Sequence, residues 1–326
     1  MLAARSKTGL TVELMRAVNP DVVALIQAAA VQPLGSLPPV EMRRNYSESR
    51  LALQPPFDPV AAIEDIAIPG KGDVALPLRL FRGTPRGRPI PCLLFLHGGG
   101  WVLGDLKSHE GICRRIAAIT GCCVMAVDYR LAPEHPFPAA VEDGATALQW
   151  TAAHAESLGI DAKRMAVGGD SAGGNLAAVL ALMGRDGNIP RLMYQLLLYP
   201  ATDLRMTGES YERVIDNLPL TAKSMRYFID HYVPSQADRS DWRASPLLAA
   251  SLENTPPAFV LTCGHDPLCT EGQLYAARLE REGVPVIAVH LSDQMHGILN
   301  MGKAIRAAGG VIDFAAAALG EAWNKA

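Results

Sequence analysis

The stretch Gly169-Asp170-Ser171-Ala172-Gly173 decides how this sequence is expected to fold. It follows Arg164–Gly168, a short run typical of a strand, and opens Ala172–Met183, an alanine- and leucine-rich run that favours a helix. Ser171 therefore lies at a sharp strand-to-helix turn, where a Cβ atom on either flanking glycine would clash. Such a turn exposes the hydroxyl beside the free N–H groups of a helix N-terminus. We expect Ser171 to be a nucleophile, and the alternative is an ordinary glycine-rich turn.

Short apolar runs bounded by turn residues recur on both sides of this turn, and they alternate with stretches of helical character. Continuous apolar runs are typical of strands buried on both faces of a parallel sheet. Strands that alternate with helices predict an α/β domain with helices on both faces of the sheet. The expected strands are Ile63–Ile68, Leu76–Phe81, Cys92–Leu96, Cys122–Val127, Met165–Val167, Leu192–Leu198, Ala258–Thr262 and Val286–Leu291. The expected core helices lie near residues 109–119, 139–153, 172–184, 271–282 and 303–323.

The composition, 326 residues that are 49% hydrophobic and 19% charged, is that of a chain with a sizeable core. Its formal net charge of −3 provides no basic field for nucleic acid. No apolar run reaches the roughly 20 residues that span a bilayer. Glu13, Arg16 and Asp21 interrupt any secretory signal, so a cytoplasmic protein is expected. The cysteines lack the paired spacing of metal sites, which predicts reduced, buried thiols and no metal.

A serine hydroxyl needs a general base, and the base needs an acid that orients it. In a domain of this kind the acid follows a late strand and the base follows the last strand. Asp266 follows the penultimate expected strand and His296 follows the last, so both side chains are expected at the carboxyl edge of the sheet. We therefore predict that Ser171, Asp266 and His296 form a catalytic triad. Two other carboxylates that could orient the base are Asp203 and Asp293.

A second motif, His97-Gly98-Gly99-Gly100-Trp101, directly follows one of the expected strands. Attack on a carbonyl creates an oxyanion, which needs two or three fixed N–H donors. Gly98 and Gly99 can turn their backbone N–H groups inward because they have no side chain, and Ala172 provides another donor. A phosphate-binding loop is disfavoured, because the run lacks the lysine of a P-loop and the G-x-G-x-x-G pattern is absent. We expect His97 to hold the shape of the loop rather than to act as the base.

Five motifs together resemble the hormone-sensitive-lipase family of bacterial carboxylesterases. They are His97–Trp101, Tyr129–Glu134, Gly169–Asn175, Asp266–Leu268 and His296–Gly297. The resemblance runs from roughly residue 60 to the C-terminus, and it implies an α/β-hydrolase fold with a mostly parallel sheet of about eight strands and a small helical cap. It implies the same triad and oxyanion residues, and hydrolysis of carboxylic esters with short to medium acyl chains and without a cofactor. It also makes a homodimer a reasonable expectation.

Two segments do not fit the alternation of strands and helices and are expected to form the cap. The first is residues 1–55, where a helical pattern over residues 11–31 precedes prolines that break the chain. The second is residues 203–245, with a helix at Ala222–Tyr232, which leaves residues 56–202 and 246–326 for the hydrolase core. The side chains expected to line the substrate pocket are Trp101, Leu218, Met225, Phe228 and Tyr232. For the last four, packing within the cap is the alternative.

The sequence departs from the family pattern at two places near the predicted site. Asp266–Leu268 is followed by Cys269-Thr270-Glu271, where members often have Arg-Asp-Glu, and the His-Gly pair is followed by Ile298 in place of an aromatic residue. These changes concern the support of the acid loop and the shape of the pocket. Two other functions would use the same residues: amide or formamide hydrolysis, because His97–Trp101 also fits the loop of formamidases, and a catalytically inactive small-molecule receptor. The complete triad argues against the receptor.

Overall fold

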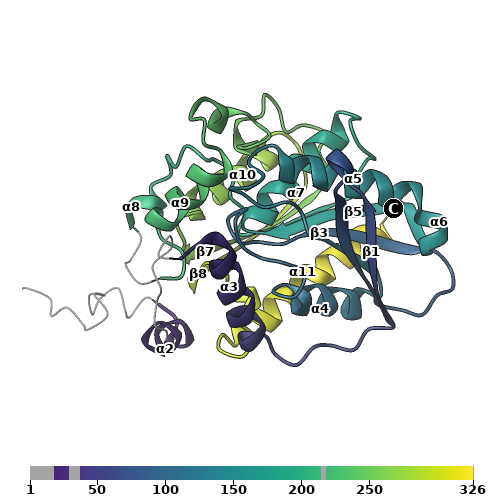
Figure 1. Cartoon of the computed structure of the whole chain (residues 1–326), viewed down its shortest axis with the longest axis horizontal. Coiled ribbons are helices and arrows are strands. Elements are labelled where there is room, and N and C mark those ends of the chain that lie inside the picture. The colour runs from purple at the N-terminus through teal and green to yellow at the C-terminus, as the bar shows by residue number, and fades with distance from the viewer. Residues whose placement is uncertain (1–17, 29–36, 214–217, 326) are drawn as a thin grey trace, which may run out of the picture.

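The sheet at the centre of the molecule has eight strands in the order β1-β2-β4-β3-β5-β6-β7-β8 (Figure 1). The computed structural model describes residues 18–28, 37–213 and 218–325. β1 pairs antiparallel with β2 and β2 with β4, and all other neighbours pair parallel. The strands are β1 Ala62–Pro69, β2 Ala75–Arg82, β3 Ile90–Leu96, β4 Cys123–Val127, β5 Ile160–Asp170, β6 Gln195–Leu198, β7 Ala258–His265 and β8 Val286–Met295. The predicted eight-stranded, mostly parallel sheet is confirmed.

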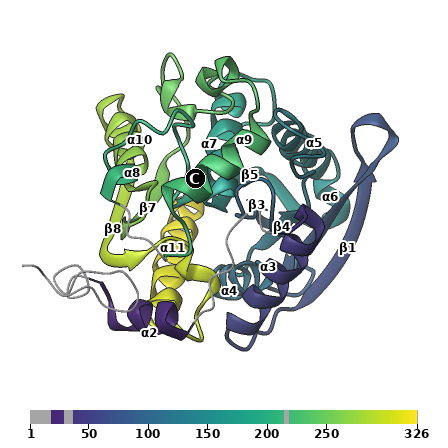
Figure 2. The ribbon, with the colours of Figure 1, turned by 60° about the vertical axis from the view of Figure 1, so that its left-hand side comes forward.

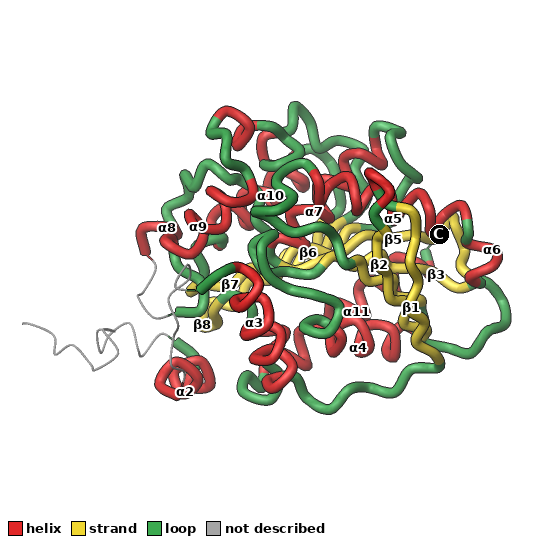
Figure 3. Tube along the Cα trace, in the orientation of Figure 1, coloured by secondary structure: helices red, strands yellow, loops and turns green. Residues whose placement is uncertain are grey.

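Helices cover both faces of the sheet, as Figure 3 shows. One face carries α4 Glu110–Thr120 and α11 Ala307–Asn324, and the other carries α5 Ala139–Ala153, α7 Ala172–Arg185 and α10 Cys269–Arg281. These five correspond to the predicted core helices. The remaining helical segments are α2 Pro20–Ala28, α3 Pro39–Leu53, α6 Ala155–Leu158, α8 Ser210–Arg213, α9 Ala222–Tyr232 and the 3₁₀ turns Lys71–Asp73, Ala237–Ser240, Pro246–Leu248 and Ile298–Asn300.

Alternate residues of the central strands enter two separate hydrophobic cores, one on each face of the sheet. In β3, Leu94 and Leu96 belong to the core that contains α5 and α7. Their neighbours Leu93 and Phe95 belong to the core that contains α4 and α11. All four side chains are fully buried. Because both faces are covered, β3 needs a continuous apolar sequence rather than an alternating one.

The N-terminal helices differ from the expected segment broken by prolines. Helix α2 lies within the helix predicted over residues 11–31. Residues 18 and 19 are not helical, and residues 11–17 and 29–31 lie outside the described residues. Helix α3 is not predicted from the sequence, because prolines immediately precede and follow it. Pro39 occupies the beginning of α3, where a missing N–H costs nothing and the fixed φ suits a helix. The proline pair therefore marks the start of a helix rather than a break.

Helices α3 and α9 approach the carboxyl ends of the strands from two distant parts of the chain (Figure 2). The helix predicted at Ala222–Tyr232 is confirmed as α9, and Thr221 caps it by accepting a hydrogen bond from the Ser224 N–H at 3.1 Å. The division into core and cap at residues 55, 202 and 245 stays a prediction. Within the described ranges, no helix combines the length and the apolar character that crossing a bilayer requires.

Candidate active site

Ser171 occupies the turn between β5 and α7. Its φ of 57° and ψ of −118° lie outside the regions that a residue with a side chain ordinarily adopts. The Ser171 N–H donates to the Leu198 carbonyl at 2.8 Å, which holds the turn. Helix α7 also packs so closely against β3 that a Cβ on Gly173 would overlap the carbonyl oxygen of Leu96. The surrounding structure thus keeps the serine in a strained conformation at the edge of the sheet.

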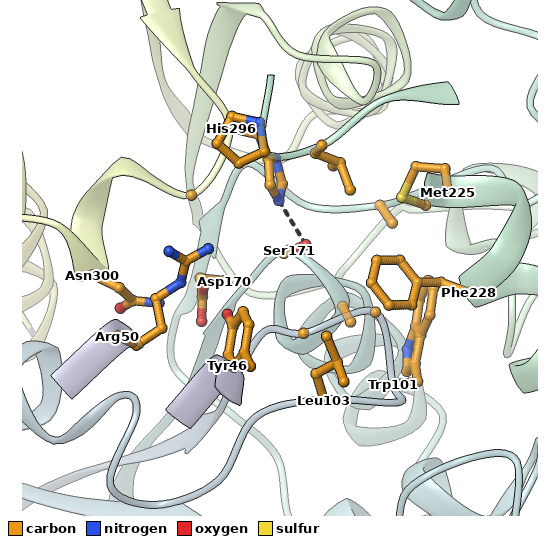
Figure 4. Close-up of a pocket in the computed structure, with 17 residues that line it drawn as sticks. Tyr46, Arg50, Trp101, Leu103, Asp170, Ser171, Met225, Phe228, His296 and Asn300 are labelled. Carbon is orange, nitrogen blue, oxygen red and sulfur yellow. Dashed lines mark hydrogen bonds between the residues drawn. The ribbon is translucent and has the colours of Figure 1, made fainter. Parts of the chain in front are cut away.

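Ser171, His296 and Asp266 form one hydrogen-bonded chain of buried side chains. Figure 4 shows the bond between Ser171 and His296. The Ser171 Oγ lies 2.8 Å from His296 Nε2, and His296 Nδ1 lies 2.7 Å from Asp266 Oδ2. Asp266 also accepts a hydrogen bond from the Leu268 N–H at 2.8 Å. When Nδ1 carries the proton, Nε2 presents an acceptor to the hydroxyl, which is what a general base requires. The structure thus brings together the three residues predicted as a triad.

Asp203 and Asp293, the two alternative carboxylates for orienting His296, bind other residues. Asp203 binds the Arg205 guanidinium with both carboxylate oxygens, each at 2.8 Å. Asp293 accepts a hydrogen bond from Asn19 Nδ2 at 2.7 Å. Because the imidazole Nδ1 is already bound by Asp266, neither carboxylate orients the histidine.

The start of α10, which follows the loop that carries Asp266, is anchored by Glu271, a buried residue in the first turn of the helix. Glu271 Oε1 accepts hydrogen bonds from the N–H groups of Thr202 at 2.7 Å and Asp203 at 3.2 Å. Its Oε2 accepts one from the Tyr211 hydroxyl at 3.0 Å. These bonds tie the start of α10 to Thr202 and to the beginning of the predicted cap. The departures from the family pattern beside Glu271 therefore leave this anchor in place.

Stability should depend on pH through Glu271. Burial raises the pKa of Glu271 to about 8 from its ordinary 4.5, even though three hydrogen bonds favour the carboxylate. The native state therefore holds this proton more tightly than the unfolded chain does. Its contribution to the free energy of unfolding is present below pH 4.5 and is lost as the pH rises through about 8. Glu271→Gln should remove this loss, which is on the order of 2–4 kcal/mol.

Urea unfolding of the wild type and Glu271→Gln at about pH 5 and about pH 8 checks this expectation. Glu280→Gln is the matched control, because Glu280 lies on the same helix with its side chain exposed. The control should keep the pH dependence of the wild type. An identical pH dependence in all three proteins would mean that Glu271 does not titrate as described.

In the glycine loop after β3, the N–H groups that remain free are not the predicted pair. The Gly98 N–H donates to Asp170 Oδ1 at 2.8 Å, so it is not available to an oxyanion. Gly99 and Gly100, with φ of 123° and 62°, line the cavity at the nucleophile, and no described residue accepts a hydrogen bond from their N–H groups. The prediction is therefore wrong for Gly98. For Gly99 and Ala172 the oxyanion role stays a prediction, and Gly100 becomes a further candidate donor. Three consecutive glycines do not reveal which N–H a buried carboxylate will bind.

His97 makes the contacts expected of a residue that holds the loop. Its Nδ1 lies 2.9 Å from the Gly98 carbonyl oxygen, and its ring stacks on Tyr129 with the centroids 4.3 Å apart. The Tyr129 hydroxyl donates to the His97 carbonyl at 2.7 Å. Burial, with His109 nearby, lowers the pKa of His97 to about 4, so the ring is neutral near pH 7.

A cavity of about 180 Å³ opens over the nucleophile (Figure 4). Among the predicted pocket residues, Trp101, Met225 and Phe228 line it. Tyr232 and Leu218 do not, and the prediction is wrong for both. Tyr232 stacks on Trp101 with the ring centroids 4.5 Å apart, and Leu218 is buried in the core that contains α4 and α11. Apolar spacing marks a side chain as buried but does not show whether it faces a core or a cavity.

Comparison with known proteins places the chain in a family. The family described as alpha/beta hydrolase fold matches residues 93–300. The ethyl acetate hydrolase of Pseudomonas putida is 38% identical over 303 residues, which cover 89% of this chain and 94% of that protein. The carboxylesterase NlhH of Mycobacterium tuberculosis is 37% identical over 263 residues, 79% of this chain and 82% of that protein. The chain belongs to the hormone-sensitive-lipase family of carboxylesterases.

Solved esterase structures share the fold of this carboxylesterase almost throughout. An ester hydrolase from the metagenome of Lake Arreo matches with a TM-score of 0.89 and 35% identity, over 93% of this chain and 98% of that one. An esterase from Pyrobaculum calidifontis matches with a TM-score of 0.86 and 37% identity, over 93% of this chain and 98% of that one. These proteins are named for ester hydrolysis, which favours the ester reaction over the amide reaction and over a receptor.

Tyr46 and Arg50 on α3 also line the cavity of this carboxylesterase, and neither residue is predicted from the sequence. The sequence does contain a pattern that indicates this helix face. Arg43, Tyr46, Arg50 and Gln54 recur at intervals of three and four residues, which places them on one face of a helix. The prolines on both sides of this segment favour a loop instead, and so conceal the pattern.

Proposed function

We propose that this carboxylesterase hydrolyses esters with short to medium acyl chains through an acyl-enzyme on Ser171. One observation carries the proposal: the hydrogen-bonded chain from Asp266 through His296 to Ser171 ends at a cavity lined by Gly99 and Gly100. This arrangement combines an activated nucleophile, an oriented base and a fixed site for negative charge.

In the first half of the reaction, His296 Nε2 accepts the proton of Ser171 as Oγ attacks the carbonyl carbon of the ester. Asp266 holds the Nδ1–H of the imidazole and stabilises its protonated form. The bond between the carbonyl carbon and the alcohol oxygen then breaks. The alcohol leaves with the proton from His296, and the acyl group remains on Oγ.

Negative charge on the carbonyl oxygen is stabilised by the N–H groups of Gly99, Gly100 and Ala172. Ala172 is the first residue of α7, so its N–H also lies at the positive end of the helix dipole. Losing one donor of this kind typically costs about 10²–10³ in rate. In the second half, water gives a proton to His296 and attacks the acyl carbon, and the Ser171 oxygen leaves with that proton as the acid is released.

The size of the cavity supports small acyl groups. Its volume of about 180 Å³ lies below the roughly 300–1,000 Å³ of pockets that hold drug-sized ligands. The apolar rings of Trp101 and Phe228 limit its extent. With p-nitrophenyl esters from acetate to palmitate, we expect kcat/KM to be highest for a short or medium chain and to fall steeply towards palmitate.

A variant that enlarges the cavity sharpens this test. Phe228→Ala should move the preferred chain length upward, because the ring it removes lines the cavity. Tyr227→Ala, the matched control on the same helix, should leave the preferred length unchanged, since Tyr227 does not line the cavity. A wild-type preference for palmitate would contradict the proposed substrate range.

We also propose that residues 1–55 and 203–245 form the two parts of the cap. The support for this division is that α3, from the first segment, and α9, from the second, both contribute side chains to the cavity. Substrate specificity would then depend on residues from both segments.

A further inference from the structure

The catalytic cavity contains a cation with no anionic partner. Arg50 lines the cavity, and no carboxylate of the described residues forms an ion pair with its guanidinium. Its Nε is buried and has no hydrogen-bond partner, while the guanidinium lies over the ring of Tyr46, 4.7 Å from the centroid. Arg50 is half-buried, and a charge that is partly removed from water is stabilised by an opposite charge nearby. An anionic group on the substrate would provide that charge.

Helix α3 is fixed to the core on both sides of Arg50, so the backbone that carries this side chain is held beside the cavity. Towards the N-terminus of the helix, Arg43 Nε donates to the Val102 carbonyl at 2.8 Å. Beyond its C-terminus, Gln54 Oε1 accepts a hydrogen bond from the Gly111 N–H at 2.6 Å. The backbone at Arg50 therefore needs little further ordering when the cavity binds a ligand.

The one carboxylate that lines the cavity, among the described residues, is already bound by other groups. Asp170 Oδ1 accepts the hydrogen bond from Gly98 and lies 3.2 Å from His109 Nε2. Burial opposes ionisation, but His109 and the Gly98 N–H hold the pKa of Asp170 below its ordinary value. The negative charge of Asp170 is thus directed at these groups, and the guanidinium of Arg50 remains without a carboxylate.

The two ends of the cavity differ in character, with Ser171 between them in the view of Figure 4. The polar end is lined by Tyr46, Arg50 and Asn300, and the apolar end by Trp101, Met225 and Phe228. Asn300 Oδ1 is a second buried polar atom without a partner. An ester whose carbonyl carbon lies at Ser171 would place its acyl arm at one end of the cavity and its alcohol arm at the other.

We propose that the carboxylesterase prefers esters that carry a carboxylate on one arm, such as half-esters of dicarboxylic acids, and that Arg50 binds this carboxylate. The inference rests on the proposed function, because it places the reacting carbonyl at Ser171. A guanidinium donates two parallel N–H bonds to a carboxylate, and a neutral group of the same shape accepts them more weakly. The apolar end then holds a short uncharged arm.

Two matched pairs of substrates test the proposal. Monoethyl succinate and ethyl levulinate differ only in a carboxylate or a methyl ketone on the acyl arm. Acetoxyacetate and acetoxyacetone differ in the same way on the alcohol arm. In at least one pair, Arg50→Gln should lower the ratio of kcat/KM for the charged ester to that for the neutral ester by about 10- to 100-fold, mainly through KM. Arg50→Lys should restore part of the ratio, and Arg44→Gln, an exposed neighbour on α3, should not change it.

Binding measurements separate this proposal from the proposed reaction. Calorimetric titration of Ser171→Ala with monoethyl succinate and with acetoxyacetate reports affinity without turnover. Adding Arg50→Gln should weaken the binding of at least one of them by about 10- to 100-fold, whether or not Ser171 is the nucleophile. If Arg50→Gln left both the charged-to-neutral ratios of kcat/KM and the affinities for the two charged esters unchanged, the proposed role of Arg50 would be overturned. An equal loss of kcat/KM for charged and neutral esters would also overturn it, because that result is expected of a residue with a purely structural role.

Discussion

Replacing Ser171 with alanine should reduce kcat for ester hydrolysis by about 10⁴-fold or more. Without Oγ no acyl-enzyme can form, and only binding and the oxyanion donors remain to assist the attack of water. The fold should persist, because backbone hydrogen bonds to Leu198 and from Asn175 hold the turn. Release of p-nitrophenol from p-nitrophenyl acetate measures the loss.

A second serine provides the control for this experiment. Ser235 is exposed and does not line the cavity, so Ser235→Ala should keep the kcat/KM of the wild type. If Ser171→Ala, prepared free of wild-type enzyme, kept more than about a tenth of the wild-type kcat, Ser171 could not be the nucleophile.

Gly173→Ala should have the largest effect on stability. A Cβ at this position would overlap the carbonyl oxygen of Leu96 and lie 2.7 Å from that of His97. Both are backbone atoms, so β3 and α7 would have to separate where they form the nucleophile turn. We expect the free energy of unfolding to fall by about 3 kcal/mol or more, measured by urea denaturation.

The same substitution at Gly309 is the matched control. Gly309 lies in α11, and no heavy atom outside its immediate backbone lies within 4 Å of a Cβ placed there. Alanine favours a helix over glycine by about 0.5–1 kcal/mol, so Gly309→Ala should raise the free energy of unfolding slightly. Equal stability of the two variants would show that close packing at Gly173 does not limit the fold.

The sheet and the nucleophile turn could be predicted because local sequence determines them. A strand covered on both faces must be apolar at every position, as in Leu93–Leu96, and this pattern differs from that of an amphipathic helix. The turn at Ser171 needs small residues on either side, in part because a Cβ on Gly169 would overlap the backbone of Gly173 within the turn itself. Asp266 and His296 then followed from the order of the strands, which fixes the edge of the sheet where each loop emerges.

The finer features of the site could not be predicted because they depend on contacts between distant parts of the chain. The N–H of Gly98 is taken by Asp170, which lies 72 positions away, and nothing within the glycine motif indicates this. Helix α3 depends on Arg43 and Gln54 for its attachment to the core, while its own prolines indicate a loop. Whether Tyr232 faces the cavity or packs behind Trp101 is likewise decided by tertiary structure.

Mass spectrometry of the enzyme during turnover of p-nitrophenyl acetate tests the central claim most directly. Quenching with acid within the first turnover should trap protein that has gained one acetyl group, carried on the peptide that contains Ser171. The same interval should release a burst of about one p-nitrophenol per active site, as expected when acylation precedes slower deacylation. Steady ester hydrolysis with no acetylated protein, or with acetyl on a peptide that lacks Ser171, would contradict the account.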